Sequence, residues 1–170
     1  MNSILKGLIA IMALLSVTVS GAQDKNKTDA LKPVFDNYFL VKDALVKADG
    51  KTAAAKSKDL VAAIANVDMG KLSPEEHTVW MKVQHDLKED TEHISGTNDV
   101  GHQRDHFMTL SKSIYELQKV SHTDVPVYYQ YCPMANKGKG ANWLSRESAI
   151  KNPYYGQQML SCGKTIETIK

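Results

Sequence analysis

The sequence predicts an all-α protein, an up-and-down four-helix bundle followed by a partly irregular C-terminal tail in which a short β-hairpin can form. Apolar residues recur at the 3.6-residue spacing of an amphipathic helix in four successive segments. Capping residues separate these segments, and the connections between them are short. We therefore assign residues 33–121 to the bundle and 122–170 to the tail, within one domain over 33–170.

The first two predicted helices are defined by apolar stripes and by glycines. The first begins at Pro33, which suits an initial helical turn, and Gly50 is expected to be its C-terminal cap. Its apolar stripe comprises Val34, Tyr38, Val41, Leu45 and Ala48. The second spans residues 52–67 and is expected to end by Gly70.

The third and fourth predicted helices have clearer boundaries. The third starts with a capping box, in which Ser73 precedes Pro74 and Glu76, and it runs to about Ser95. Gly96 ends it, and Asn98 or Asp99 caps the fourth, which extends to about residue 120. The two buried stripes comprise Trp80, Val83, Leu87, Ile94, Val100, Phe107, Leu110, Ile114 and Leu117.

The composition changes in the tail. Five of the seven tyrosines, four of the ten glycines and both cysteines lie in residues 125–170. Apolar and polar residues alternate over 125–131 as they do in a strand, and residues 165–169 are its candidate partner. The tail therefore contains the chain's only predicted β-structure.

Residues 1–22 have the organisation of a cleaved export signal. Lys6 precedes an apolar run over 8–19, and the small residues of Ser20-Gly21-Ala22 suit a signal peptidase. The run is about a dozen residues long, shorter than the roughly 20 that span a bilayer. We expect a periplasmic or secreted protein with no membrane span after cleavage, and a flexible leader over 23–32.

The charge balance and the motif content exclude several function classes. With 21 basic and 19 acidic side chains the net charge is +2, too small for a protein that neutralises a nucleic-acid backbone. Two cysteines are too few for a four-thiolate zinc site. No nucleophile elbow or paired catalytic carboxylates can be assembled, and Cys132 has no histidine in a recognisable motif with it, so we expect a protein that is not an enzyme.

Four sulfur-bearing residues are the strongest candidates for chemistry. Cys132 and Met134 form one pair, and Met159 and Cys162 form the other. Thiolate and thioether sulfur prefer soft ions, so these four residues suit Cu(I) or Ag(I). The alternative is a disulfide between Cys132 and Cys162 that closes a long loop, with both methionines filling gaps in the core. The two interpretations exclude each other, because an oxidised pair supplies no thiolates.

The histidines offer a weaker metal signal. His102 and His106 are four residues apart and face the same way on the fourth predicted helix, although no zinc-protease motif surrounds them. His106, beside Phe107, is the better candidate for an additional ligand to the sulfur site. The eight-residue spacing of His77, His85 and His93 turns each one about 80° from the last, so the three cannot form one site. They are expected to be solvated surface residues.

Several runs of the sequence resemble a known family. In the tail they are Val127-Tyr128-Tyr129-Gln130-Tyr131-Cys132-Pro133-Met134-Ala135, Gly140-Ala141-Asn142-Trp143-Leu144-Ser145, Ile150-Lys151-Asn152-Pro153-Tyr154-Tyr155-Gly156 and Met159-Leu160-Ser161-Cys162-Gly163. In the helical part they are Val67-Asp68-Met69, the region of Trp80, Gln103-Arg104-Asp105-His106-Phe107 and Leu110-Ser111. From about Pro33 to the end, the chain resembles domain of unknown function 3347.

That resemblance carries its own implications. The family occurs in small exported bacterial proteins and as a domain appended to the periplasmic adaptors of copper and silver efflux systems, which implies a role in handling soft metals. The family's C-P-M falls on Cys132 and Met134, its M-L-x-C-G falls on Met159 and Cys162, and His106 lies in its arginine-containing helix. The expected function is therefore an exported copper- or silver-binding protein of metal homeostasis or efflux, whose partner is a cation-efflux adaptor or another envelope protein. The alternative is a disulfide-stapled interaction module of the cell envelope that binds no metal.

Overall fold

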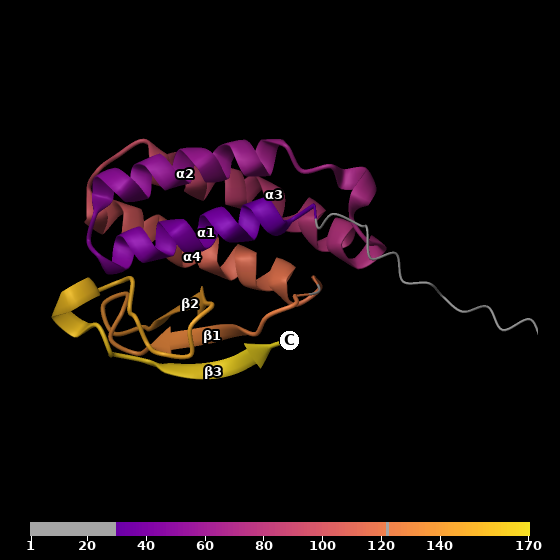
Figure 1. Ribbon diagram of the computed structural model, residues 1–170. Helices are drawn as coiled ribbons and strands as arrows, with labels where there is room; N and C mark the ends of the chain where they lie inside the picture. The colour runs from indigo at the N-terminus through magenta and orange to yellow at the C-terminus, as the bar shows by residue number, and fades with distance from the viewer. Residues whose placement is uncertain (1–29, 122) are drawn as a thin grey trace, which may run out of the picture.

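A computed structural model describes residues 30–121 and 123–170. The predicted export signal over 1–22 and most of the leader over 23–32 lie outside these residues. Four helices come first, and a small sheet packs beneath them (Figure 1). In chain order the elements are α1 (Lys32–Val46), α2 (Gly50–Ala65), the 3-10 turn η1 (Met69–Lys71), α3 (Pro74–Ser95), α4 (Val100–Gln118), β1 (Val127–Cys132), β2 (Ala141–Ser145), the 3-10 turn η2 (Gly156–Met159) and β3 (Lys164–Ile169).

The all-α prediction is wrong, because the C-terminal part forms a three-stranded antiparallel sheet in the order β2-β1-β3. The predicted pairing of 125–131 with 165–169 is confirmed as the contact between β1 and β3. The sequence analysis missed β2, in which four of the five residues are buried, so that its sequence lacks the alternation of a half-exposed strand. Pairing with β1 and packing against α4 establish it as a strand.

One buried tyrosine joins the helices to the sheet. Tyr38 on α1 stacks on Phe107 of α4, with ring centroids 5.2 Å apart. Its hydroxyl lies 2.8 Å from Ser111 Oγ and accepts a hydrogen bond from the backbone N–H of Leu144 in β2. Burial raises the pKa of this tyrosine far above its ordinary value, so it stays neutral and can keep donating. The bundle and the sheet therefore share one core.

The predicted helix boundaries are partly confirmed. The capping box at Ser73 is present, with Ser73 Oγ and the Glu76 carboxylate each accepting a backbone N–H, and Asp99 caps α4. Gly50, however, is not the cap of α1, because Ala48 takes the left-handed conformation there and Gly50 opens α2. A side chain on Gly50 would overlap the Asn98 carbonyl oxygen, which explains glycine at that position.

Arg104 is one of the residues that connect the loop between β2 and β3 to the helices. Arg104 on α4 donates hydrogen bonds to the carbonyl oxygens of Pro153 and Leu45, at 2.8 and 3.2 Å. This contact holds the loop against α4 and the end of α1. Within residues 30–121 and 123–170, no helix combines the length and apolar character that crossing a membrane requires.

Candidate metal centre

Three histidines meet on the surface where α3 and α4 run side by side. His93 comes from the end of α3, and His102 and His106 come from the start of α4. One candidate ligand nitrogen from each lies within 4.8 Å of the other two. The rings of His93 and His106 stack with centroids 4.2 Å apart, and the His102 ring centroid is 4.7 Å from that of His106. We refer to these residues as the histidine triad.

The helical hairpin explains why these histidines meet. Gly96 and Asp99 bound a short turn, so α3 and α4 are antiparallel, and residues at similar distances from the turn face one another. Buried Gln103 holds this turn, since its amide nitrogen donates to the carbonyl oxygens of Thr97 and Gly50 at 2.7 and 2.9 Å. The triad therefore lies beside a turn that Gln103 holds both from within, at Thr97, and to α2, at Gly50.

A buried carboxylate orients the central histidine. Asp90, only 8% exposed, places Oδ1 at 2.9 Å from His106 Nδ1. A carboxylate only accepts hydrogen bonds, so this contact places the imidazole proton on Nδ1 and leaves the lone pair of Nε2 free to bind a metal ion. A histidine backed in this way is the usual arrangement in protein metal sites.

The spacing and surroundings of the triad suit a cation. Imidazole nitrogens around one tetrahedral ion lie about 3.4 Å apart, and their lone pairs point at the ion. The stacked rings of His93 and His106 are parallel within 5°, so the exposed His93 and His102 side chains would rotate about their side-chain bonds to bind one ion with His106. A surface hollow of about 360 Å³ adjoins the triad, and the Glu89 and Glu92 side chains line that hollow. Carboxylates beside the triad favour a positive ion electrostatically. This group can therefore hold a metal ion.

The two cysteines also lie together, in a different part of the fold. Cys132 ends β1 and is fully buried, while Cys162 precedes β3 and is half-buried. No disulfide joins them in the structure, and their sulfur atoms are 2.9 Å apart. The hydrogen bond with Cys132, aided by burial, raises the pKa of the Cys162 thiol. A metal ion bound by this pair would therefore have to displace protons.

The two predicted thioether ligands lie near the cysteines along the chain but differ in exposure. Met134 is exposed, and its carbonyl oxygen accepts a hydrogen bond from the Tyr155 hydroxyl at 2.7 Å. Met159 is half-buried, and its carbonyl oxygen accepts the N–H of Cys162 at 3.0 Å. Both of these contacts are made by main-chain oxygens, and ligation by the four sulfurs stays a prediction.

The sequence analysis anticipated only part of the triad. It placed His102 and His106 on one helix face, which is confirmed, but it treated His93 as ordinary surface and did not consider Asp90. The capping signals at Gly96 and Asp99 could have predicted these contacts, because they indicate a short turn between two antiparallel helices. Such a hairpin brings His93 opposite His102 and Asp90 opposite His106. Periodicity within a single helix could not show this.

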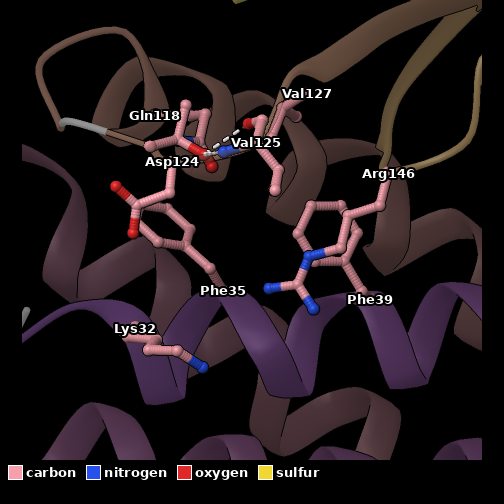
Figure 2. A pocket seen from close by; sticks show the side chains of 9 residues that line it. Lys32, Phe35, Phe39, Gln118, Asp124, Val125, Val127 and Arg146 are labelled. Atoms are coloured by element: carbon pink, nitrogen blue, oxygen red, sulfur yellow. Dashed lines mark hydrogen bonds between the residues drawn. The ribbon is translucent and has the colours of Figure 1, made fainter. Parts of the chain in front are cut away.

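Another surface cleft has a different character. It lies between α1 and the segment leading into β1, has a volume of about 360 Å³, and is lined by the rings of Phe35 and Phe39 (Figure 2). The Arg146 guanidinium lies 4.4 Å from the centre of the Phe39 ring and pairs with Asp36, and Lys32 is at the opposite side. An apolar floor with two cationic side chains does not suit a metal ion.

Comparison with known proteins places the helical part in a family. The family model described as protein of unknown function (DUF3347) matches residues 34–125, more than half of the 170. The chain belongs to this family. The DUF3347 match covers α1 to α4 and therefore the whole histidine triad, whereas β1, β2 and β3 and all four predicted sulfur ligands lie beyond its end. No curated protein and no solved structure matches the chain.

Proposed function

We propose that this DUF3347 protein is an exported metal-binding protein that binds a copper ion at the histidine triad. The observation that carries the proposal is the convergence of three imidazoles from two helices with a buried carboxylate behind one of them. Surface histidines need no such partner, and a fixed Nδ1 proton matters mainly when Nε2 acts as a ligand.

The donor set narrows the class of ion. Neutral imidazole suits copper, zinc, nickel and iron, and affinity for a given nitrogen site rises to a maximum at Cu²⁺ along the first-row divalent series. The carboxylates of Glu89 and Glu92 add negative charge beside the triad, which favours a divalent ion over a monovalent one. We therefore expect the triad to prefer Cu²⁺, with Zn²⁺ as a weaker competitor.

We assign the reduced form of copper to the second donor set. Cys132, Met134, Met159 and Cys162 supply the soft sulfur ligands that Cu(I) and Ag(I) select. The proximity of the two thiols supports this assignment, because both sulfur atoms must be close enough to bind the same two-coordinate or three-coordinate ion. We assign His106 to the triad rather than to the sulfur set, since Asp90 and His93 are its neighbours.

Exposure of the triad suits a protein that receives and releases ions rather than one that stores them. His93 and His102 are exposed, so a partner's ligands can reach the bound ion from solvent. We propose a periplasmic or secreted location and a cation-efflux adaptor or similar envelope protein as the recipient. The protein binds and passes on the ion without transforming a substrate.

A metal titration tests the triad. The variant Cys132→Ser/Cys162→Ser is titrated with Cu²⁺ or Zn²⁺ in a non-coordinating buffer, because two adjacent free thiols would reduce Cu²⁺ and bind Zn²⁺. Calorimetry compares this parent protein with the same protein carrying His93→Ala or His106→Ala. Each variant should bind the ion at least about tenfold more weakly, because one of three ligands is lost. The control is Glu75→Ala, which removes an exposed polar side chain about 27 Å farther along α3 at 1.5 Å per residue. Equal affinity in all four proteins would overturn the proposal.

The closeness of the two thiols also favours the alternative of a disulfide-stapled interaction module. Mass measurement of the exported protein before and after thiol alkylation separates the two functions. Complete oxidation, together with indifference to Cu(I), Ag(I) and Cu²⁺, would support the module. Reduced thiols and loss of Cu(I) binding in Cys132→Ser or Cys162→Ser would support the sulfur site.

A further inference from the structure

A row of metal-ligating side chains runs along α3 and turns gradually around it. Every fourth residue over 77–93 carries a donor atom, and all of these residues are exposed; the row is His77, Met81, His85, Glu89 and His93. Its last member belongs to the histidine triad, and its first lies near the opposite end of α3, which runs the length of the bundle (Figure 1). We call this row the α3 ridge.

Helix geometry makes successive members of the ridge neighbours. Residues four apart on a helix are offset by about 40° and have Cβ atoms about 5–6 Å apart, so their side chains can reach one another. Met81 thus lies between His77 on one side and His85 on the other. The buried face of α3 comprises Trp80, Leu87 and Ile94. The side chains of His77, Met81 and His85 are exposed instead.

Met81 has no packing role that would account for it. It is 53% exposed, whereas a methionine that fills a core gap is covered by its neighbours. Its sulfur is available at the surface and only accepts a hydrogen bond from Gln84 Nε2 at 3.3 Å. Thioether sulfur is a weak acceptor, so exchange of this contact for a metal ion costs little.

We propose that Met81 and its two flanking histidines bind a soft monovalent ion, Cu(I) or Ag(I), at a site separate from the triad and from the cysteines. One thioether and one imidazole form a neutral pair of donors, which suits an ion of single charge that accepts two ligands. His77 and His85 each form such a pair with the same sulfur, so the site holds one ion at a time. Sharing one sulfur lets the ion pass from one histidine to the other without leaving the protein.

The surroundings of His85 separate soft from divalent ions. Its Nδ1 lies 3.5 Å from Asp86 Oδ1 and 3.9 Å from Glu89 Oε2, so carboxylate oxygens are within reach of a divalent ion there. A divalent ion such as Zn²⁺ prefers these carboxylate oxygens to a thioether sulfur. A response of the Met81 sulfur is therefore specific to the soft monovalent ion.

Silver titration of the full chain, with methionine methyl groups labelled by carbon-13, tests the site. Ag⁺ is added as the nitrate, first to saturate the thiols and then in further equivalents, while NMR follows the Met81 methyl and the His77 and His85 rings. These signals should shift together, and Met81→Leu should weaken binding at this step by about tenfold or more. The matched control is Met69→Leu, which removes another exposed thioether, 47% exposed, from η1.

Single histidine variants sharpen the result. His77→Ala or His85→Ala should weaken the silver step only slightly, because the other pair remains, and the double variant should lose it as Met81→Leu does. An unmoved Met81 methyl signal, equal binding by Met81→Leu and the wild type, or an equal shift with Zn²⁺ would overturn the proposal. Signals from the histidine triad are read separately, so the two sites are judged independently.

Discussion

Asp90 offers the sharpest test of the metal centre, because it touches a ligand without being one. Asp90→Asn keeps the size of the side chain but removes its charge, and Asp90→Ala removes the hydrogen bond to His106 as well. Both atoms of this contact are largely buried, with side-chain exposures of 11% for Asp90 and 24% for His106. Water therefore compensates only in part for its loss.

The expected magnitude follows from what the carboxylate does. A metal ion draws electron density from the imidazole, so the negative charge behind Nδ1 stabilises the bound state more than the free state. Loss of such a partner weakens metal affinity by about 10- to 100-fold, or about 1.4–2.7 kcal/mol. We expect Asp90→Asn near the lower bound, since an amide oxygen still accepts the Nδ1 proton, and Asp90→Ala near the upper.

Calorimetric titration with Cu²⁺ or Zn²⁺ gives the affinities, and nitrogen-15 NMR of the His106 ring reports which nitrogen carries the proton. Asp59→Asn is the control, because Asp59 lies on α2 and pairs with Lys56 rather than with a histidine. Unchanged affinity in Asp90→Ala, with the protein folded, would refute the reasoning that the carboxylate orients a ligand.

Two further predictions concern the fold. Gly50→Ala should destabilise the protein by about 1–3 kcal/mol in urea unfolding, although alanine favours helix, because its methyl group would overlap the Asn98 carbonyl oxygen. The control Gly96→Ala should be nearly neutral, because its new methyl group would lie at ordinary contact distance from its neighbours. A larger loss of stability in Gly96→Ala than in Gly50→Ala would contradict the packing argument. The hydrogen bond from the Tyr115 hydroxyl to Glu167 raises the pKa of Tyr115 to about 12, so its contribution to stability is complete below pH 10 and is lost as the pH rises through 12. Glu167→Gln should move that pKa back toward 10 in an NMR titration of the ring, and an unmoved value would exclude the carboxylate as the cause.

The sequence by itself determined the local structure of this protein. The capping box at Ser73, the cap at Asp99 and the apolar stripes placed α3 and α4 within a residue or two of their observed ends. Alternation also identified β1 and its partner β3. These features depend on residues close together in the chain, so the pattern of side chains along the sequence carries them.

Only the tertiary structure decided which distant residues meet. The buried strand β2 has no alternation of its own and exists because β1 and α4 cover it. His93 and Asp90 join His102 and His106 only when α3 packs antiparallel to α4, and the two thiols meet only when β3 returns beside β1. Contacts between elements depend on how whole faces pack together, and the periodicity of one helix or strand does not identify the element that packs against it.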